Sequence, residues 1–258
     1  MDATPAIRNP LRRSLPLRLR AATIHFSLSL AIFAVALYLI LLRWYPGFHF
    51  GVDGGWQGVR IMAAVDLVLG PLLTLVVFNP FKARKLIVFD LACIGAAQLA
   101  ALAWGFHAIH GQRPVSLNFH EGTFYSMPGR SLALTAEAPA VLERISQGRL
   151  ALVFVAPPGN AEERSRTARR AELKLMAHED AVFFRPLREH WPEVQSTALA
   201  PNAVRDAAFQ AEIGDFIARH GGTVADYRFF RYQGGYGTCF VGLTAAGELA
   251  GALACESQ

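Results

Sequence analysis

Two polar side chains lie inside runs of apolar residues, where a polar group serves function or packing because burying it is costly. Asp66 lies seven residues into the run Val59 to Phe78, and Gln98 lies midway along the run Leu86 to Ile109. If these runs form antiparallel helices, both side chains reach a similar depth. The pair fits an interhelical hydrogen bond or one step of a proton relay. Because no chain of further acids, lysines and histidines continues through these runs, the hydrogen bond is favoured.

The residues near this pair bear on the same choice. Gly70 and Pro71 follow Asp66 by about one helical turn, and proline predicts a kink whose freed carbonyl must be satisfied by neighbouring groups. Asp90 lies nearer the start of its apolar run. A membrane enzyme acting through Asp66 and Asp90 is an alternative, and it predicts that Asp66→Asn abolishes activity without lowering the protein level.

The remaining chemical groups show no catalytic pattern. His107 and His110 are three residues apart, and His120 with Glu121 follows ten residues later. Without an HExxH helix or a Cys/His cluster this spacing indicates scattered surface histidines. GxSxG elbows, phosphate-binding loops and paired carboxylates are absent from the sequence as well. We therefore expect neither an enzyme nor a protein that binds a metal or an organic cofactor.

The three cysteines differ in their predicted surroundings. Cys93 lies in the third apolar run, where a thiol behaves as a small hydrophobic group. Cys239 and Cys255 lie in a segment that reads as a β-hairpin with Ala246 to Glu248 at its tip, and pairing Leu243 with Gly251 would place the two cysteines opposite each other. A disulfide or two free thiols both fit this pattern, and no CxxC redox motif is present.

Three apolar runs must position the polar pair. They extend over about 22–42, 59–78 and 86–109, each close to the ~20 residues that a membrane-spanning helix requires. The first run is too long for a signal-peptide core and lacks a small-x-small cleavage site. The sequence thus predicts a basic N-terminus (1–21), a three-helix transmembrane anchor (22–110) and a small α+β domain (111–258).

Basic residues predict the orientation of this anchor. The first 20 residues contain five arginines and one acid, Asp2, and the loop between the second and third runs contains Lys82, Arg84 and Lys85 with no acid among them. The positive-inside rule places both segments in the cytoplasm. Three crossings then place everything after His110 in the periplasm of a bacterium. Four aromatic residues near the outer boundary fit an interfacial belt: Trp44, Tyr45, Trp56 and Trp104.

The charge of the last segment excludes a nucleic-acid partner. The formal net charge of the chain is +5, but residues 110–258 contain 15 Lys and Arg against 16 Asp and Glu. A nucleic-acid-binding domain would concentrate positive charge on its soluble part. The net positive charge of the chain therefore reflects the topology of its membrane anchor and contact with inner-membrane lipid.

The α+β domain is predicted from several short patterns. Strands are expected over Pro114 to Phe119, Leu150 to Val155, Tyr227 to Tyr232 and Cys239 to Leu243. One helix is expected from Asn160 to about His178, with its arginines (Arg164, Arg166, Arg169 and Arg170) on a solvated face. A second helix is expected to open at Asn202 and to stop at Gly221 and Gly222.

The anchor resembles a known family. The resemblance covers about residues 20 to 119 and rests on polar and glycine or proline residues at fixed places in otherwise generic helices: Trp44-Tyr45-Pro46, Asp66 to Pro71, Asn79-Pro80, Asp90, Gln98, Gly105 and Arg113-Pro114. These motifs resemble the TfpX/TfpZ family of type IV pilin accessory proteins. Beyond Phe119 the resemblance is one of length and element order.

The resemblance implies a non-enzymatic, chaperone-like inner-membrane protein that acts on the major type IV pilin before or during pilus assembly. Small residues in the third run could form a groove for a pilin helix, so bulky substitutions at Ala96 or Ala100 would weaken capture. Packing among the protein's own helices explains the same residues. The competing class is a membrane-anchored periplasmic ligand-binding or sensor module that acts through a partner protein.

Overall fold

The helices and strands of this chain fall into two compact units. The computed structural model describes residues 10–146, 150–173, 175–201 and 204–257. The helical unit comprises Met1–Ile40 and Trp56–Ile109, and the sheet unit comprises Leu41–Gly55 and His110–Gln258. The loop at 41–55, which the sequence assigned to the anchor, thus belongs to the sheet unit. Arg8 and the other residues of the first nine lie outside the described residues.

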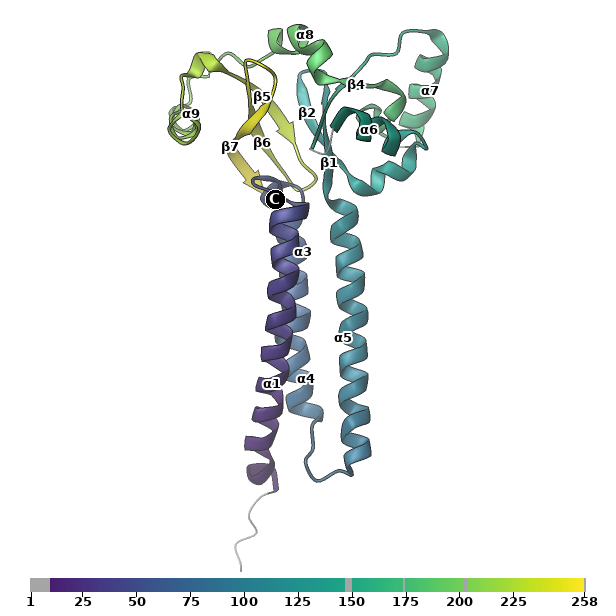
Figure 1. Ribbon diagram of the computed structural model, residues 1–258, viewed down its shortest axis with the longest axis vertical. Helices are drawn as coiled ribbons and strands as arrows, with labels where there is room; N and C mark the ends of the chain where they lie inside the picture. Colours follow the sequence, from purple (N-terminus) through teal and green to yellow (C-terminus); the bar gives the residue numbers. More distant parts are fainter. Residues whose placement is uncertain (1–9, 147–149, 174, 202–203, 258) are drawn as a thin grey trace, which may run out of the picture. The chain divides into compact units, whose positions relative to one another are not determined.

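The helical unit is built from three long apolar helical segments (Figure 1). The first is α1 (Pro10–Leu39), which continues into the π-helical η1 (Ile40–Trp44). The second joins α3 (Gly55–Ala63), the π-helical η2 (Ala64–Leu69) and α4 (Gly70–Val77), and the third is α5 (Arg84–Gln112). All three are long and apolar enough to cross a membrane.

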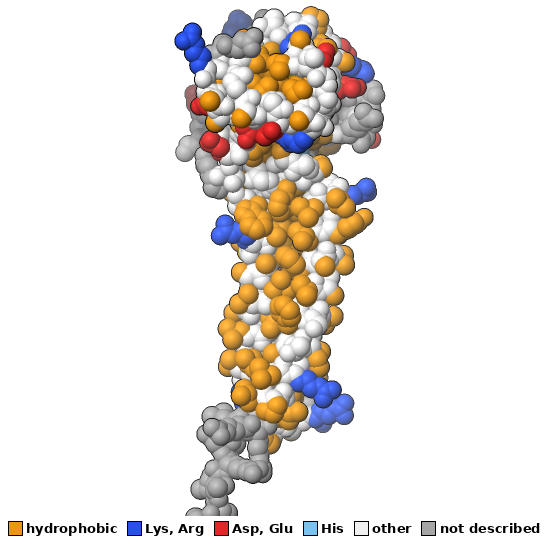
Figure 2. Space-filling view, turned by 90° about the vertical axis from the view of Figure 1, so that its left-hand side faces the viewer, with side chains coloured by type: hydrophobic (Ala, Val, Ile, Leu, Met, Phe, Trp, Pro, Cys, Tyr) orange, Lys and Arg blue, Asp and Glu red, His pale blue; other side chains and the backbone are white. Residues whose placement is uncertain are grey.

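The surface of these helices is apolar. Figure 2 shows hydrophobic side chains over the length of the helices, with Lys and Arg side chains near their ends. Leu28, Val68 and Val76 are each more than 60% exposed. Apolar side chains at such exposure are stable in lipid and unfavourable in water, so this surface is compatible with insertion in a bilayer.

A π-helical segment, η2, precedes Pro71, where the sequence predicts a kink. Pro71 has no N–H and its ring would clash with the carbonyl of residue 67 in a regular α-helix. In the structure, η2 ends at Leu69 and α4 begins at Gly70, with Pro71 in its first turn. The wider π turn before Pro71 accommodates the ring.

The sheet unit contains one mixed sheet of seven strands in the order β4-β3-β1-β2-β5-β6-β7. The pairs β1/β3 and β2/β5 are parallel, and the other neighbours are antiparallel. The strands are β1 (Pro114–His120), β2 (Thr123–Pro128), β3 (Ala151–Val155), β4 (Phe184–Pro186), β5 (Tyr227–Gln233), β6 (Gly237–Thr244) and β7 (Leu249–Ser257).

Helices cover both faces of this sheet. One face packs against α6 (Ala138–Ser146) through Val153 and against α9 (Ala207–His220) through Phe229. The other face packs against α8 (Trp191–Ser196) and α2 (His49–Val52) through residues such as Phe230. The remaining helical segments are α7 (Ala161–Glu172), η3 (Gly129–Leu134), η4 (Ala177–Glu179), η5 (Ala181–Phe183), η6 (Leu187–His190) and η8 (Val224–Asp226).

The four strands expected from the sequence are present, and so is the hairpin of β6 and β7. Two helix boundaries differ. Asn160 caps α7 as expected, but the helix ends at Glu172 instead of near His178. The expected start of α9, Asn202, lies outside the described residues, and α9 begins at Ala207 because the Asp206 side chain accepts hydrogen bonds from the N–H groups of Ala208 and Phe209.

Candidate functional site

A cavity of about 260 Å³ lies between α1, η2 and α5. Its polar lining consists of His25, Ser29, Asp66 and Gln98, and the rest is Leu28, Ile32, Gly95, Leu99 and Leu102. We call it the Asp66 cavity. The structure thus places Asp66 and Gln98 on one lining, as the antiparallel arrangement predicts, although no hydrogen bond joins them among the described residues.

Packing against Gly70 explains the position of the Gln98 side chain. A Cβ atom at residue 70 would overlap the side-chain amide of Gln98, so only glycine permits this approach. Asp90 lies apart from this cavity and forms an ion pair of 2.6 Å with Lys82. Gly70 therefore leaves room for the Gln98 side chain, and Asp90 forms its ion pair with Lys82 in the loop between α4 and α5.

A buried polar network joins the loop at 41–55 to the sheet. The Nδ1 atom of His49 lies 2.6 Å from the Oδ2 atom of Asp53, and the Tyr232 hydroxyl donates to the same oxygen at 2.8 Å. The other carboxylate oxygen accepts from the backbone N–H of Gly235. Burial is the main reason that the pKa of Tyr232 lies well above its usual value.

Glycine at position 234 allows this loop to approach the turn after β5. A Cβ atom at Gly234 would lie 2.5 Å from the Val52 carbonyl oxygen and 2.8 Å from the Asp53 carboxylate. The backbone N–H of Tyr236 donates to the Val52 carbonyl at 2.8 Å. His49 and Asp53 resemble a general-base pair, but no nucleophile adjoins the buried Nε2 atom of His49 in the described part of the chain. The network therefore serves to position the loop.

Two adjoining cavities follow the face of the sheet that carries α6 and α9. The larger, of about 700 Å³, lies beside α9 over β2, β5 and β6, and the smaller, of about 380 Å³, lies between β2, η4 and the turn after β5. Tyr125 and Gln233 line both cavities. We call the two together the sheet groove.

The lining of the sheet groove is acidic. Five carboxylates face two guanidinium groups: Asp53, Glu179, Asp206, Glu212 and Glu256 against Arg130 and Arg231. His178 also lines the groove and stacks on Tyr125 at 4.2 Å. Burial lowers the pKa of His178 to about 4, so its ring is neutral at neutral pH. Carboxylates therefore outnumber basic groups on the lining of the sheet groove.

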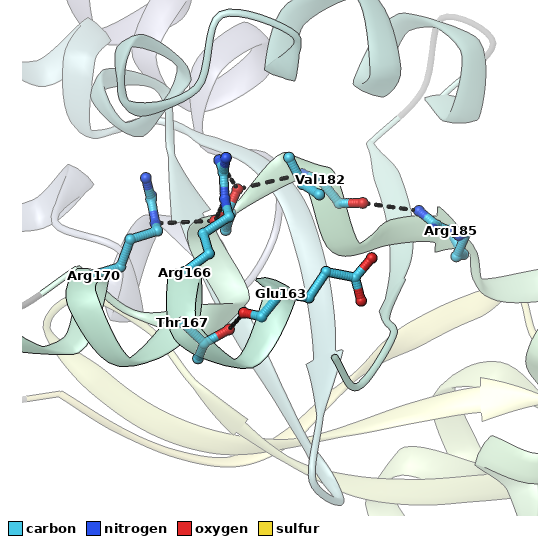
Figure 3. Close-up of polar contacts among 7 residues, drawn as sticks. Glu163, Arg166, Thr167, Arg170, Val182 and Arg185 are labelled. Carbon is cyan, nitrogen blue, oxygen red and sulfur yellow. Dashed lines mark hydrogen bonds and ion pairs between the residues drawn. The ribbon is translucent and has the colours of Figure 1, made fainter. Parts of the chain in front are cut away.

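The arginines of α7 are not all on a solvated face, which corrects the sequence expectation. Figure 3 shows Arg166 and Arg170 side by side on α7, pointing toward one carboxylate. That carboxylate is the fully buried Asp180, which accepts two hydrogen bonds from Arg166 at 2.8 and 3.0 Å and lies 3.1 Å from Arg170. Burial alone would raise the pKa of Asp180, but the Arg166 hydrogen bonds and the Arg170 charge hold it below its ordinary value.

Cys239 and Cys255 are free thiols in the structure, and the expected strand register is wrong by one residue. Gly251 pairs with Gly242 instead of Leu243. A β-bulge between Thr238 and Phe240 then sets Cys239 against Ala254 and Cys255, so the two cysteines still meet. The hydrogen bond between their thiols, together with burial, raises the pKa of Cys239.

Several residues of the family motif have local structural roles. Asn79 accepts a hydrogen bond from the backbone N–H of Phe81 and starts the turn through Pro80. A Cβ atom added at Gly105 would lie 3.4 Å from the Met62 side chain, and Arg113, just before Pro114, donates to the His110 carbonyl at 2.7 Å. Asn79 thus stabilises a turn, Gly105 allows close packing of two helices, and Arg113 binds a carbonyl group at the end of α5.

The first aromatic motif does not form a simple belt. Tyr45, between Trp44 and Pro46, is fully buried in the sheet unit, and burial raises its pKa above the usual value. Trp44 packs edge-to-face on His110 at 5.0 Å. Trp56 and Trp104 are 47% and 75% exposed. Tyr45 is therefore a core residue, which corrects its assignment to an interfacial surface.

The described residues contain no group of three or more His, Cys, Asp or Glu side chains that could hold a metal ion. His49, Asp53, Tyr232 and Asp180, and also His25 and Ser29 of the Asp66 cavity, are polar residues that sequence reasoning missed. A signal for the first pair was present, since His49 and Asp53 are four residues apart and share one face of a helical turn.

The chain is similar to fimbrial assembly proteins of Dichelobacter nodosus. The protein of serogroups C1 and C2 is 35% identical over 96 residues, which are 37% of this chain and 73% of that protein. The proteins of serogroup I and serogroup E1 are 35% and 33% identical over 96 residues, and the match spans only 37% of the length of each. No protein-family model and no solved structure matches the chain. On the similarity to the first relative, the chain belongs to the family of fimbrial assembly proteins.

Proposed function

We propose that this chain is an inner-membrane accessory protein of type IV pilus assembly, with its N-terminus in the cytoplasm and its sheet unit in the periplasm. The observation that carries the proposal is the 35% identity to a fimbrial assembly protein over 73% of that protein's length. The three apolar helices support membrane insertion. The basic residues among the first 20 positions and at positions 82–85 support the orientation.

The partner is the major pilin, and the sheet groove is the surface that contacts its periplasmic part. The excess of carboxylates in the groove favours a basic patch on the pilin. Chaperoning, stabilisation and presentation to the assembly machinery would each use such a contact. No enzymatic step is part of this role.

Affinity recovery tests the proposal. The tagged full-length protein is crosslinked in native inner membranes and purified, and the recovered proteins are identified. We expect the major pilin. Recovery of a kinase or transporter without pilin would overturn the proposal in favour of the sensor module.

Two matched charge reversals test the groove in the same experiment. Glu256 is exposed in the sheet groove, and Glu189 is exposed in η6, outside it. We expect Glu256→Lys to lower pilin recovery ~3-fold because it places a cation against a basic patch, while Glu189→Lys leaves recovery unchanged. Equal recovery by both variants would exclude the groove as the contact surface.

A further inference from the structure

Asp66 is a buried carboxyl group of η2. It is only 7% exposed, and it lines the Asp66 cavity. Among the described residues no hydrogen bond or ion pair to its side chain is found. A carboxyl group in an apolar medium requires a hydrogen-bond partner in either protonation state, and the described part of the chain supplies none for Asp66.

Two of the three polar neighbours of Asp66 contact other residues, and Ser29 is the third. The ring of His25 lies 2.5 Å, Nδ1 to Oγ1, from Thr74 on α4. The Gln98 amide packs against Gly70, one turn beyond Asp66. The π-helical turn of η2 carries Asp66 itself, and such turns occur frequently at functional sites.

The wall of the cavity formed by α5 is open. Only 6% of the most apolar stretch of α5 is buried in the structure, against 28% for the segment Gly55–Val77. Gly95, Gln98 and Leu99 present one helical face to the cavity. A Cβ atom added at Gly95 would meet no atom within 4 Å, so this face has room for a further helix. Ala96 and Ala100, the positions at which the sequence analysis placed its test of a groove, are not part of the lining.

We propose that the Asp66 cavity receives one transmembrane helix of a partner protein, which places a hydrogen-bond donor at the Asp66 carboxyl group. A lipid chain can fill the apolar part but offers no donor, whereas a helix with Ser, Thr, Asn, Gln or Lys at this depth fills the cavity and satisfies the carboxyl group. The proposal rests on the proposed function, because the pilin is then the partner that supplies the helix.

Photocrosslinking from inside the cavity tests the occupant. A photoreactive amino acid replaces Leu99, which lines the cavity and is 62% exposed, or Val76, which is 64% exposed on α4 and does not line it. The tagged full-length protein is irradiated in native membranes. We expect a pilin adduct from position 99 and none from position 76. Equal adducts from both positions, adducts only to a second copy of this chain, or no protein adduct at position 99 would overturn the proposal.

Two pairs of variants separate docking from folding. Gly95→Leu places a bulky side chain in the cavity, where its Cβ atom would meet no atom within 4 Å, and Ala100→Leu places the same side chain at an exposed position of α5. We expect the first to abolish the adduct from position 99 and the second to keep it. Asp66→Leu should reduce the adduct about 3-fold to 20-fold, which corresponds to the loss of one interhelical hydrogen bond. Asp66→Asn should retain it, because an amide still bonds. An adduct unchanged by both Gly95→Leu and Asp66→Leu would exclude the cavity.

The outcomes for the cavity and for the proposed function are distinguishable. Pilin that is recovered with the tagged protein but forms no adduct at position 99 would overturn the cavity proposal and leave the accessory function in place. A position-99 adduct to a different membrane protein, with no pilin recovered, would overturn the accessory function and leave the cavity as a helix-docking site.

Discussion

A single buried carboxylate, Asp180, connects α7 to the segment that precedes β4. It accepts two hydrogen bonds from Arg166, lies against Arg170 and also accepts from the backbone N–H of Val182. Because Asp180 is fully buried, its charge depends on these partners. Arg166 is 39% exposed in its side chain and Arg170 14%, so the cluster has one buried side and one side open to solvent.

Asp180 should make the protein sensitive to acid. Its folded-state pKa lies below the unfolded value of about 3.9. The stabilisation is therefore complete above pH ~4 and is lost as the pH falls through the folded-state pKa. We expect Asp180→Asn to lower the free energy of unfolding at pH 7 by ~2–3 kcal/mol and to flatten its decline below pH ~4.

Chemical denaturation of the full-length protein in detergent, followed by fluorescence at several pH values, measures this effect. Asp215→Asn is the control, since Asp215 is exposed on α9. Identical pH profiles for the wild type and Asp180→Asn would contradict the assigned role.

At the scale of elements, the hairpin of β6 and β7 depends on its bulges. The register shifts between Thr238 and Phe240 and again between Gly242 and Leu243. At the first shift, Ala254 takes a positive φ of 49°. A bulge bends an edge strand and limits pairing with another chain, and here it also brings Cys255 to Cys239.

We expect Cys239 and Cys255 to form a disulfide in protein isolated from an oxidising periplasm. The bulge between Thr238 and Phe240 already sets Cys239 against Cys255 on the neighbouring strand. The bond should stabilise the protein by ~3 kcal/mol. Mass spectrometry of unreduced peptides would detect it, and denaturation with and without reductant would measure its effect. Cys239→Ser should remove that dependence on reductant, and two free thiols in periplasmic protein would disprove the bond.

At the scale of the whole molecule, function depends on the side of the membrane at which each unit lies. Lys82 in the loop before α5 and Arg84 and Lys85 at the start of α5 are basic, and residues 110–258 are nearly neutral. This asymmetry favours a cytoplasmic loop and a periplasmic sheet unit. Only in that orientation can the sheet groove meet a periplasmic partner.

Labelling with a membrane-impermeant maleimide tests the orientation. In a variant whose three native cysteines are serine, Ser196→Cys places a thiol at an exposed position of the sheet unit and Ala83→Cys places one in the loop between α4 and α5. We expect intact spheroplasts to label only the first, because the second faces the cytoplasm. Permeabilised cells should label both. Labelling of Ala83→Cys in intact spheroplasts would reverse the orientation.

The sequence by itself determined the features that depend on neighbouring residues. Continuous apolar runs give the three long helices, because a helix in lipid must satisfy its own backbone. Alternation gives β1, a short apolar run gives β3, and the Asn160 cap gives the start of α7. The sequence analysis did not predict β2, although β2 follows β1 through a turn at Glu121 and Gly122, which both have positive φ.

Only the tertiary structure decided which distant residues meet. Tyr232 bonds to Asp53, 179 residues away, through a loop that sequence periodicity assigned to the anchor. Two arginines of α7 that were expected on a solvated face, Arg166 and Arg170, instead form ion pairs with the buried Asp180. The sheet groove and the Asp66 cavity each combine segments that are remote in sequence. Burial and hydrogen bonding between such segments depend on packing in three dimensions, which local patterns of polarity do not encode.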